Sequence, residues 1–203
     1  MENSNLNPDE KRALLKDYNH RINNDLQALL AFIKLQRRFG IDNEEILNST
    51  SVSIASISAI QNLMYETDED ENFISTGKFF EYFIKILDEQ YSNSNIKFSG
   101  EVENDFNMHP KKVFHLMFLV TEMVNLSINV SFKDDSEHEI SFSLEKNGEE
   151  CLLIYSDNGE GIKETISESS IQTVLVEQSI KQINGTLESS NDNSTVHIKF
   201  NYN

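Results

Sequence analysis

The stretch His20-Arg21-Ile22-Asn23-Asn24-Asp25-Leu26-Gln27 places a histidine on the polar side of an amphipathic helix. Apolar residues recur around it three or four positions apart, as on one face of an α-helix, at Tyr18, Ile22, Leu26, Leu29 and Ile33. At about 100° per residue the last four lie within roughly 60° of arc, and His20 lies about 160° away. Asn24 follows one turn later on the polar face. We therefore expect His20 to be held in water on a rigid helix, where a side chain that reacts with a partner would be placed.

The pattern predicts two long helices in the first third of the chain. Asn7-Pro8-Asp9-Glu10 is typical of a helix start, because Pro fits the first turn and acids favour the positive end of the helix dipole. The first helix is predicted to end near Phe39, before Gly40. A second is predicted over about 43–65, with apolar residues at Ile46, Leu47, Ile54, Ile57, Ile60 and Met64. Helices joined by so short a turn are antiparallel. One hairpin cannot bury both apolar stripes well, so we expect a dimeric four-helix bundle with these stripes facing inward.

The remainder alternates between helical and strand patterns. The acidic turn 67–72 marks a domain boundary, which gives a hairpin domain over 1–68 and a second domain over 69–203. The patterns predict helices at about 76–91, 110–129 and 170–183, and strands at about 96–100, 139–146, 151–157, 186–190 and 196–202. This order indicates an α/β sandwich, with one mixed sheet and helices on one of its faces.

Composition and charge narrow the function classes. The chain has 203 residues, of which 38% are hydrophobic, and a net charge of −17, which disfavours nucleic acid or an anionic membrane as a partner. Residues 1–40 carry seven Lys/Arg against five Asp/Glu, so the first helix alone lacks an acidic excess; ordinary solvated helix surface explains this equally well. No apolar run approaches the roughly 18 residues of a membrane span, and the N-terminus does not resemble a signal peptide. Cys151 is the single cysteine, so a cytoplasmic protein is expected.

Taken together, these features resemble the two-domain core of bacterial sensor histidine kinases. The first box resembles the branch whose phosphorylation box reads His-Arg-Val-Lys-Asn-Asn-Leu-Gln, with Asn23 in place of Lys and Asp25 in place of the second Asn. The likeness extends from about residue 12 to residue 200. It implies a dimeric hairpin whose His20 carries a phosphoryl group, with Arg21 and Asn24 in supporting roles. It also implies a second domain of the ATP-binding type.

The boxes that bind ATP in that family are only partly kept. Its Glu-Leu-Val-x-Asn box corresponds to Glu122-Met123-Val124-Asn125-Leu126, so Leu126 stands where the family's Asn holds Mg²⁺. The downstream Lys/His position falls on Asn129. Asn125 is about 100° away around the helix and cannot simply take the place of that Asn. The box Asp157-Asn158-Gly159-Glu160-Gly161 is intact, and in the family its Asp reads the adenine amino group. A purely structural Asx/Gly turn after a strand would have the same sequence pattern.

The two later boxes depart further. Where the family has roughly Gly-Leu-Gly-Leu-x-Leu-Val, this chain has Ser170-Ile171-Gln172-Thr173-Val174-Leu175-Val176. Glycines let backbone amides approach phosphates, and side chains obstruct that approach. The family's Gly-Thr-x-Phe has become Ser194-Thr195-Val196-His197. Glu122, Asp157, Gly159 and Gly161 are therefore nucleotide-binding candidates only if nucleotide binding is retained, and ATP-dependent autophosphorylation is not expected.

The resemblance therefore predicts a histidine phosphotransferase of a two-component phosphorelay. In it, His20 accepts a phosphoryl group from the aspartate of one receiver domain and passes it to another. We expect no tightly bound cofactor and no metal site; the receiver would supply Mg²⁺. The remaining histidines lack a metal-binding pattern, namely His109, His115, His138 and His197. Two alternatives stay open: an active cytoplasmic histidine kinase that uses ATP, and a non-catalytic dimeric adaptor that binds response regulators.

Overall fold

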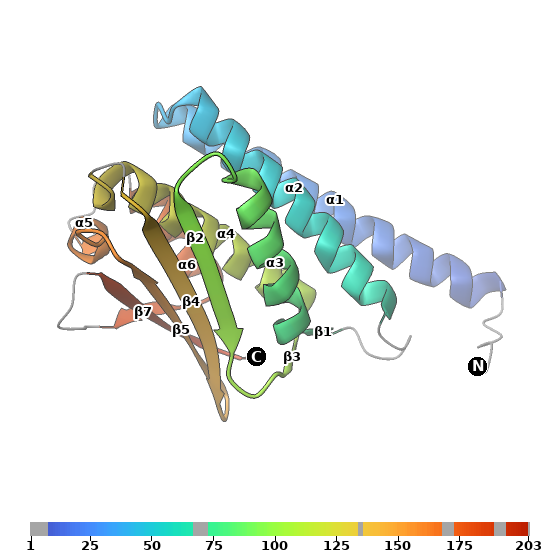
Figure 1. The fold of residues 1–203 in the computed structure, drawn as a ribbon. Coiled ribbons are helices and arrows are strands. Elements are labelled where there is room, and N and C mark those ends of the chain that lie inside the picture. The colour runs from blue at the N-terminus through green and yellow to red at the C-terminus, as the bar shows by residue number, and fades with distance from the viewer. Residues whose placement is uncertain (1–7, 67–72, 134–135, 168–172, 189–193, 203) are drawn as a thin grey trace. The chain divides into compact units, whose positions relative to one another are not determined.

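A computed structural model describes residues 8–66, 73–133, 136–167, 173–188 and 194–202 (Figure 1). It divides into two compact units, Met1–Ile41 and Asp42–Asn203. In the first, α1 (Pro8–Arg38) ends before Gly40, whose φ of +72° is the left-handed conformation that suits glycine at a helix end. The second unit begins with α2 (Asn43–Glu66). The predicted helical hairpin region is therefore confirmed, while the dimeric bundle stays a prediction. The boundary at residue 68 also stays a prediction and lies outside the described residues.

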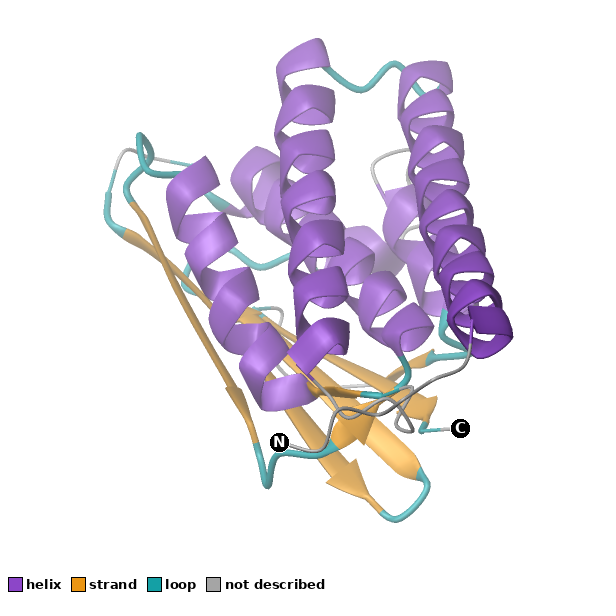
Figure 2. Ribbon diagram, turned by 90° about the vertical axis from the view of Figure 1, so that its right-hand side faces the viewer, coloured by secondary structure: helices purple, strands orange, loops and turns teal. Residues whose placement is uncertain are grey.

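The second unit is built on one mixed sheet of five strands. Its order is β2 (Ile96–Val102), β4 (His138–Asn147), β5 (Glu150–Asp157), β7 (Thr195–Asn201) and β6 (Thr186–Glu188). Only the β2–β4 pair is parallel. The helices α3 (Thr76–Gln90), α4 (Pro110–Leu126) and α6 (Val174–Gln182) cover one face of this sheet, and α2 packs against α3 and α4 (Figure 2). The predicted sheet with helices on one face is confirmed.

Several short elements were not predicted from the sequence. A two-stranded sheet pairs β1 (Ile74–Ser75) with β3 (Asn107–Met108), and α5 (Lys163–Ser167) follows the Asp157 turn. The helix predicted over 110–129 ends instead in a π-helical turn, η1 (Ser127–Ser131). Elements of two to five residues are too short for a hydrophobic period to reveal. The helix predicted over 170–183 has its expected start outside the described residues. The expected end of the strand 186–190 lies outside them as well.

The core lies between the sheet and α4. Alternation along β5 points Cys151, Leu153, Tyr155 and Asp157 toward the helices, where all four are buried. Every residue from Leu116 to Leu126 is buried, so this part of α4 has no solvent face. Within the described residues, one helix, Pro110–Ser131, is apolar and long enough to cross a membrane, contrary to the expectation that no segment approaches this. Since 78% of its most apolar window is buried inside the protein, it has the character of a core helix.

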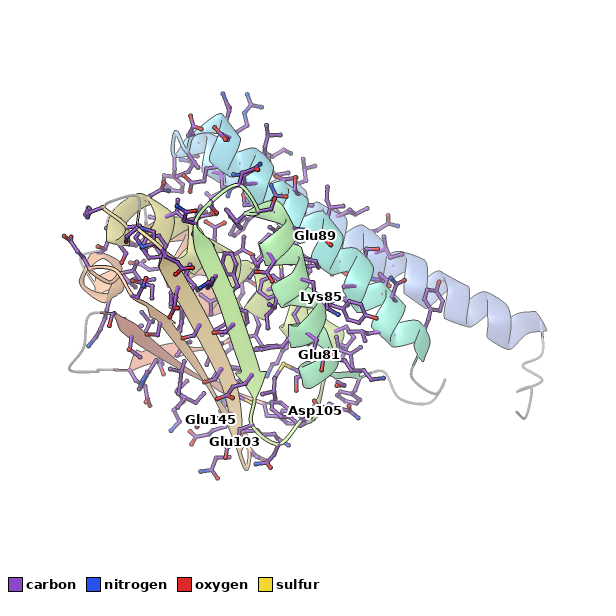
Figure 3. All side chains as sticks on the ribbon, viewed as in Figure 1. Glu81, Lys85, Glu89, Glu103, Asp105 and Glu145 are labelled. Atoms are coloured by element: carbon purple, nitrogen blue, oxygen red, sulfur yellow. The ribbon has the colours of Figure 1, made fainter. Side chains whose placement is uncertain are left out.

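Among the described side chains of the second unit, the acidic ones other than Glu122 and Asp157 are exposed or half-buried. Figure 3 shows Glu81, Lys85 and Glu89 one turn apart along α3, with Asp105, Glu103 and Glu145 near one end of the sheet. Asp105 also has a structural role, because it accepts hydrogen bonds from the Ser75 hydroxyl and from the Gly77 N–H, both at 2.7 Å, at the start of α3. Partial burial raises the pKa of Asp105, but these hydrogen bonds outweigh it, and the net shift is downward.

Candidate functional site

The first part of the candidate site is the polar face of α1. His20 is exposed to solvent, as the sequence indicated, and so are Lys16 and Asn24. Arg21 lies in α1, but its side chain is outside the described residues. The helix therefore presents a histidine to water with an amide side chain one turn later. Their roles in phosphotransfer stay predictions.

The apolar stripe of α1 is only partly covered. Leu29 is buried, but Leu26, which was expected to face inward with it, is 47% exposed. Leu30 is 51% exposed. On α2, Leu47 and Ile54 are also exposed, at 66% and 55%. Both helices therefore carry apolar side chains that are open to solvent.

The second part of the candidate site is the turn that follows β5, where the carboxylate of Asp157 is buried and accepts three hydrogen bonds. Its Oδ1 accepts hydrogen bonds from the Ser131 hydroxyl at 2.5 Å and from the Gly159 N–H at 2.9 Å. Its Oδ2 accepts a hydrogen bond from the Ser127 hydroxyl at 2.9 Å. The Tyr155 hydroxyl lies 2.8 Å from Ser127 Oγ and donates to it, because the hydrogen of Ser127 is directed to Asp157. Asp157 therefore faces η1, and three hydrogen bonds satisfy it within the protein.

The glycines of the turn also lie against η1. Gly161 donates its N–H to Ser131 Oγ at 2.7 Å, and Glu160 donates its N–H to the Ser131 carbonyl at 3.1 Å. A Cβ on Gly159 would lie 2.3 Å from Ser131 Oγ and 2.6 Å from the Ser131 carbonyl oxygen. Only glycine permits so close an approach. Of the four nucleotide-binding candidates, Asp157, Gly159 and Gly161 therefore meet at Ser131.

Glu122, the fourth candidate, lies on α4 among a different set of neighbours. It is buried, and its charge contributes with burial to raising the pKa of Tyr91. The Tyr91 hydroxyl donates to Asn125 Oδ1 at 2.9 Å, while Asn125 Nδ2 is buried without a hydrogen-bond partner. Leu126 is buried as well. Asn125 thus accepts a hydrogen bond from the residue that caps the end of α3, and the expectation that it does not replace the missing Asn stays a prediction.

The remaining histidines have structural surroundings. His109 caps α4 by accepting the Lys111 N–H at 3.2 Å, and His138 stacks on Phe132 with 3.8 Å between ring centroids. Burial lowers the pKa of His115, which packs edge-on against Phe114. Cys151 is a free buried thiol, and its burial raises its pKa to about 11. In the described part of the chain, no three His, Cys, Asp or Glu side chains gather as a metal site would require.

Comparison with known proteins shows one matching family and several solved structures with a similar fold. Residues 17–91 match the sequence model of the family HisKA_2, described as histidine kinase. The fold is similar to the histidine kinase domain from Erythrobacter litoralis EL346 blue-light activated histidine kinase, with a TM-score of 0.61 and 12% identity over 87% of this chain and 94% of that one. It is also similar to the Erythrobacter litoralis EL346 blue-light activated histidine kinase, with a TM-score of 0.68 and 16% identity.

The second match covers 99% of this chain but only 62% of the other, so this chain spans less than two thirds of that protein. No curated protein matches the sequence. At these identities the structural likeness establishes the fold alone. Together with the family match over residues 17–91, it shows a histidine-kinase-like core.

Sequence reasoning missed the two serines that bind Asp157. Ser127 and Ser131 are four residues apart at the end of an apolar helix. This spacing was the only feature of the sequence that could have drawn attention to them. Their spacing places them on one side of the helix, but nothing in the sequence indicated that this side would meet the Asp157 turn.

Proposed function

We propose that this protein is a histidine phosphotransferase of a two-component phosphorelay, which passes a phosphoryl group between receiver-domain aspartates through His20. The lone pair of a neutral imidazole nitrogen attacks the phosphorus of an aspartyl phosphate. A P–N bond forms, the P–O bond to the aspartate breaks, and its electron pair remains on the released carboxylate. Transfer to the second aspartate reverses these steps. Exposure of His20 on a long helix supports the alignment that phosphoryl transfer requires.

One observation carries the choice of relay over kinase. The Asp157 carboxylate, which the family resemblance assigns to adenine, already accepts hydrogen bonds from Ser127, Ser131 and Gly159. Buried Leu126 also provides no oxygen for a hard cation such as Mg²⁺. Both features favour a phosphoryl donor other than ATP, and no tightly bound cofactor is part of the proposal.

The proposed partners are response-regulator receiver domains, whose own acidic site would supply Mg²⁺. We further propose a homodimer, supported by the apolar residues that α2 exposes, Leu47 at 66%, Ile54 at 55% and Tyr65 at 71%. Spacings of 7 and 11 residues place these side chains on one face of the helix, and exposed apolar surface on one face is typical of interaction sites. A cytoplasmic location completes the proposal, because receiver domains and their phosphoryl donors meet there.

Phosphotransfer from a labelled receiver tests the proposal. The purified chain is mixed with receiver domains that carry labelled aspartyl phosphate, and label on the chain is measured over time. We expect label that is stable to base and lost in acid, present in wild type and absent in His20→Ala. The matched control is His197→Ala, which removes a histidine from β7 and leaves the α1 face unchanged.

Two outcomes would favour the other functions. Labelling of His20 directly from ATP and Mg²⁺ would identify an active kinase and contradict the proposal. Receiver binding without transfer of label, under conditions in which the receiver is phosphorylated, would identify a non-catalytic adaptor.

A further inference from the structure

The hydroxyl of Ser131 connects two polar groups of one turn, an oxygen of the Asp157 carboxylate and the N–H of Gly161. It donates its hydrogen to Asp157 Oδ1 at 2.5 Å and accepts the Gly161 N–H at 2.7 Å. Ser131 is 1% exposed, so solvent does not compete for either bond. One side chain therefore satisfies an acceptor and a donor that lie on the same turn.

A carboxylate oxygen beside a backbone N–H is complementary to the edge of an adenine ring. The amino group of adenine donates a hydrogen bond, and the neighbouring ring nitrogen accepts one. A hydroxyl also offers one donor and acceptor lone pairs, within a single atom. Ser131 thus makes the two hydrogen bonds that the edge of an adenine would make at this turn.

We propose that Ser131 is an internal substitute for adenine, which fills the base-reading position of the Asp157–Gly161 turn and so excludes adenine nucleotides. The proposal rests on the proposed function insofar as a relay protein needs no nucleotide. It goes further, because it assigns the exclusion to a single side chain that the sequence boxes do not contain.

The packing around Ser131 supports this assignment. The Ser131 carbonyl accepts the Glu160 N–H at 3.1 Å, and Gly159 approaches so closely that even a Cβ would overlap the serine. The turn is therefore closed over η1. An adenine could bind only by displacing the hydroxyl and leaving it buried without a partner. An unpaired buried group of this kind weakens binding by about 5- to 150-fold.

The matched pair Ser131→Ala and Ser127→Ala separates exclusion from simple destabilisation. Each variant removes one hydroxyl from Asp157, but only the first frees the Gly161 N–H and leaves Oδ1 with the Gly159 N–H as its remaining donor. Binding of adenosine, ADP and inosine is measured by changes in amide NMR signals, with the fold checked by circular dichroism. Ser131→Gly is included because it also removes the methyl group that alanine retains.

We expect Ser131→Ala or Ser131→Gly to bind adenosine at least about fivefold more tightly than wild type or Ser127→Ala. Inosine, which presents an oxygen in place of the amino group, should not show this gain. Adding Asp157→Asn to either Ser131 variant should abolish the gain in affinity for adenosine. If the amide oxygen of the new Asn keeps the hydrogen bond from Ser127, its NH₂ group faces the adenine amino group, and two donors cannot form a hydrogen bond with each other.

Two results would overturn the proposal. One is wild-type affinity for adenosine equal to that of the Ser131 variants. The other is the absence of adenine-selective binding in both folded Ser131 variants. Neither result depends on transfer to His20, so failure of this inference and failure of the relay assignment are distinguishable.

Discussion

The side-chain amide of Asn129 donates a hydrogen bond to Oε2 of Glu45 at 2.8 Å and so connects η1 to the first turn of α2. Close by in sequence, Gln90 Nε2 donates to Asn48 Oδ1 at 3.0 Å and connects the end of α3 to the same helix. These polar contacts add to the packing of α2 on α3 and α4, which makes α2 part of one compact unit with the α/β sandwich, although the sequence pattern grouped it with α1. The position that the family resemblance gives to Lys or His is thus engaged by a carboxylate of the same chain.

Glu45 should make stability depend on pH. Burial raises its pKa above 4.5, the hydrogen bond from Asn129 opposes the rise, and Asp42 adds to it. Because the folded state holds the proton more tightly than the unfolded state, the free energy of unfolding falls as pH rises from 4.5 through the raised pKa. Glu45→Gln keeps an acceptor for Asn129 and loses the charge. Its stability relative to wild type should therefore increase over this interval, as measured by urea unfolding at several pH values.

The exposed neighbour Glu44 provides the control, since Glu44→Gln makes the same change in charge. A pH profile that is identical for the two variants would show that burial of Glu45 is not the cause. Glu45→Ala, which removes the acceptor, should cost about 1 kcal/mol at neutral pH.

Tyr91→Phe should destabilise the fold by about 1–3 kcal/mol, because it leaves Asn125 Oδ1 buried beside an Nδ2 that already has no partner. The double variant Tyr91→Phe/Asn125→Leu should lose less than the sum of its single variants, since the orphaned amide is gone. Chemical unfolding of all three variants gives the coupling. Tyr82→Phe, at an exposed site on α3, should stay within about 0.5 kcal/mol of wild type. If the losses in unfolding free energy of Tyr91→Phe and Asn125→Leu simply added in the double variant, the hydrogen bond between these two side chains would not be the cause.

Gly159→Ala should cost about 1–3 kcal/mol or more, because its Cβ would overlap both the hydroxyl and the carbonyl of Ser131. Gly148→Ala is the comparison, since its φ of +63° imposes strain but its surroundings are open. It should cost about 1 kcal/mol. Thermal unfolding measures both. Combining Gly159→Ala with Ser131→Ala should recover part of the loss, whereas equal costs at the two glycines would show that the close approach to η1 is unimportant.

Ile54→Glu on α2 should convert a dimer into a monomer, because Ile54 is 55% exposed on a face that carries further exposed apolar residues. The mass in solution, measured by analytical ultracentrifugation over a range of concentrations, tests this. Tyr82→Glu, which adds the same charge at a 42% exposed site on α3, should leave the mass unchanged. A wild-type chain that is monomeric at every concentration would refute the homodimer itself.

The sequence alone determined the regular elements and the polar position of His20. Helical spacing of apolar residues, with Gly40 and Pro110 at helix ends, predicted α1, α2 and the start of α4. Alternation predicted β4 and β5 and placed Asp157 at the end of a strand. These features are local, since each depends on a period of 2 or 3.6 residues within one segment, and such periods can be read without knowledge of the rest of the chain.

Only the tertiary structure decided what meets Asp157. The contact with Ser131 joins positions 26 residues apart, through a π-helical turn that no hydrophobic period indicates. The same holds for Glu45 and Asn129, which lie 84 residues apart. Hydrogen bonds of this kind depend on which surfaces pack together and on the orientation of single side chains. The sequence therefore identified His20 as the residue to test, and the structure showed that the Asp157 carboxylate, whose counterpart in the family reads adenine, accepts three hydrogen bonds from its own chain.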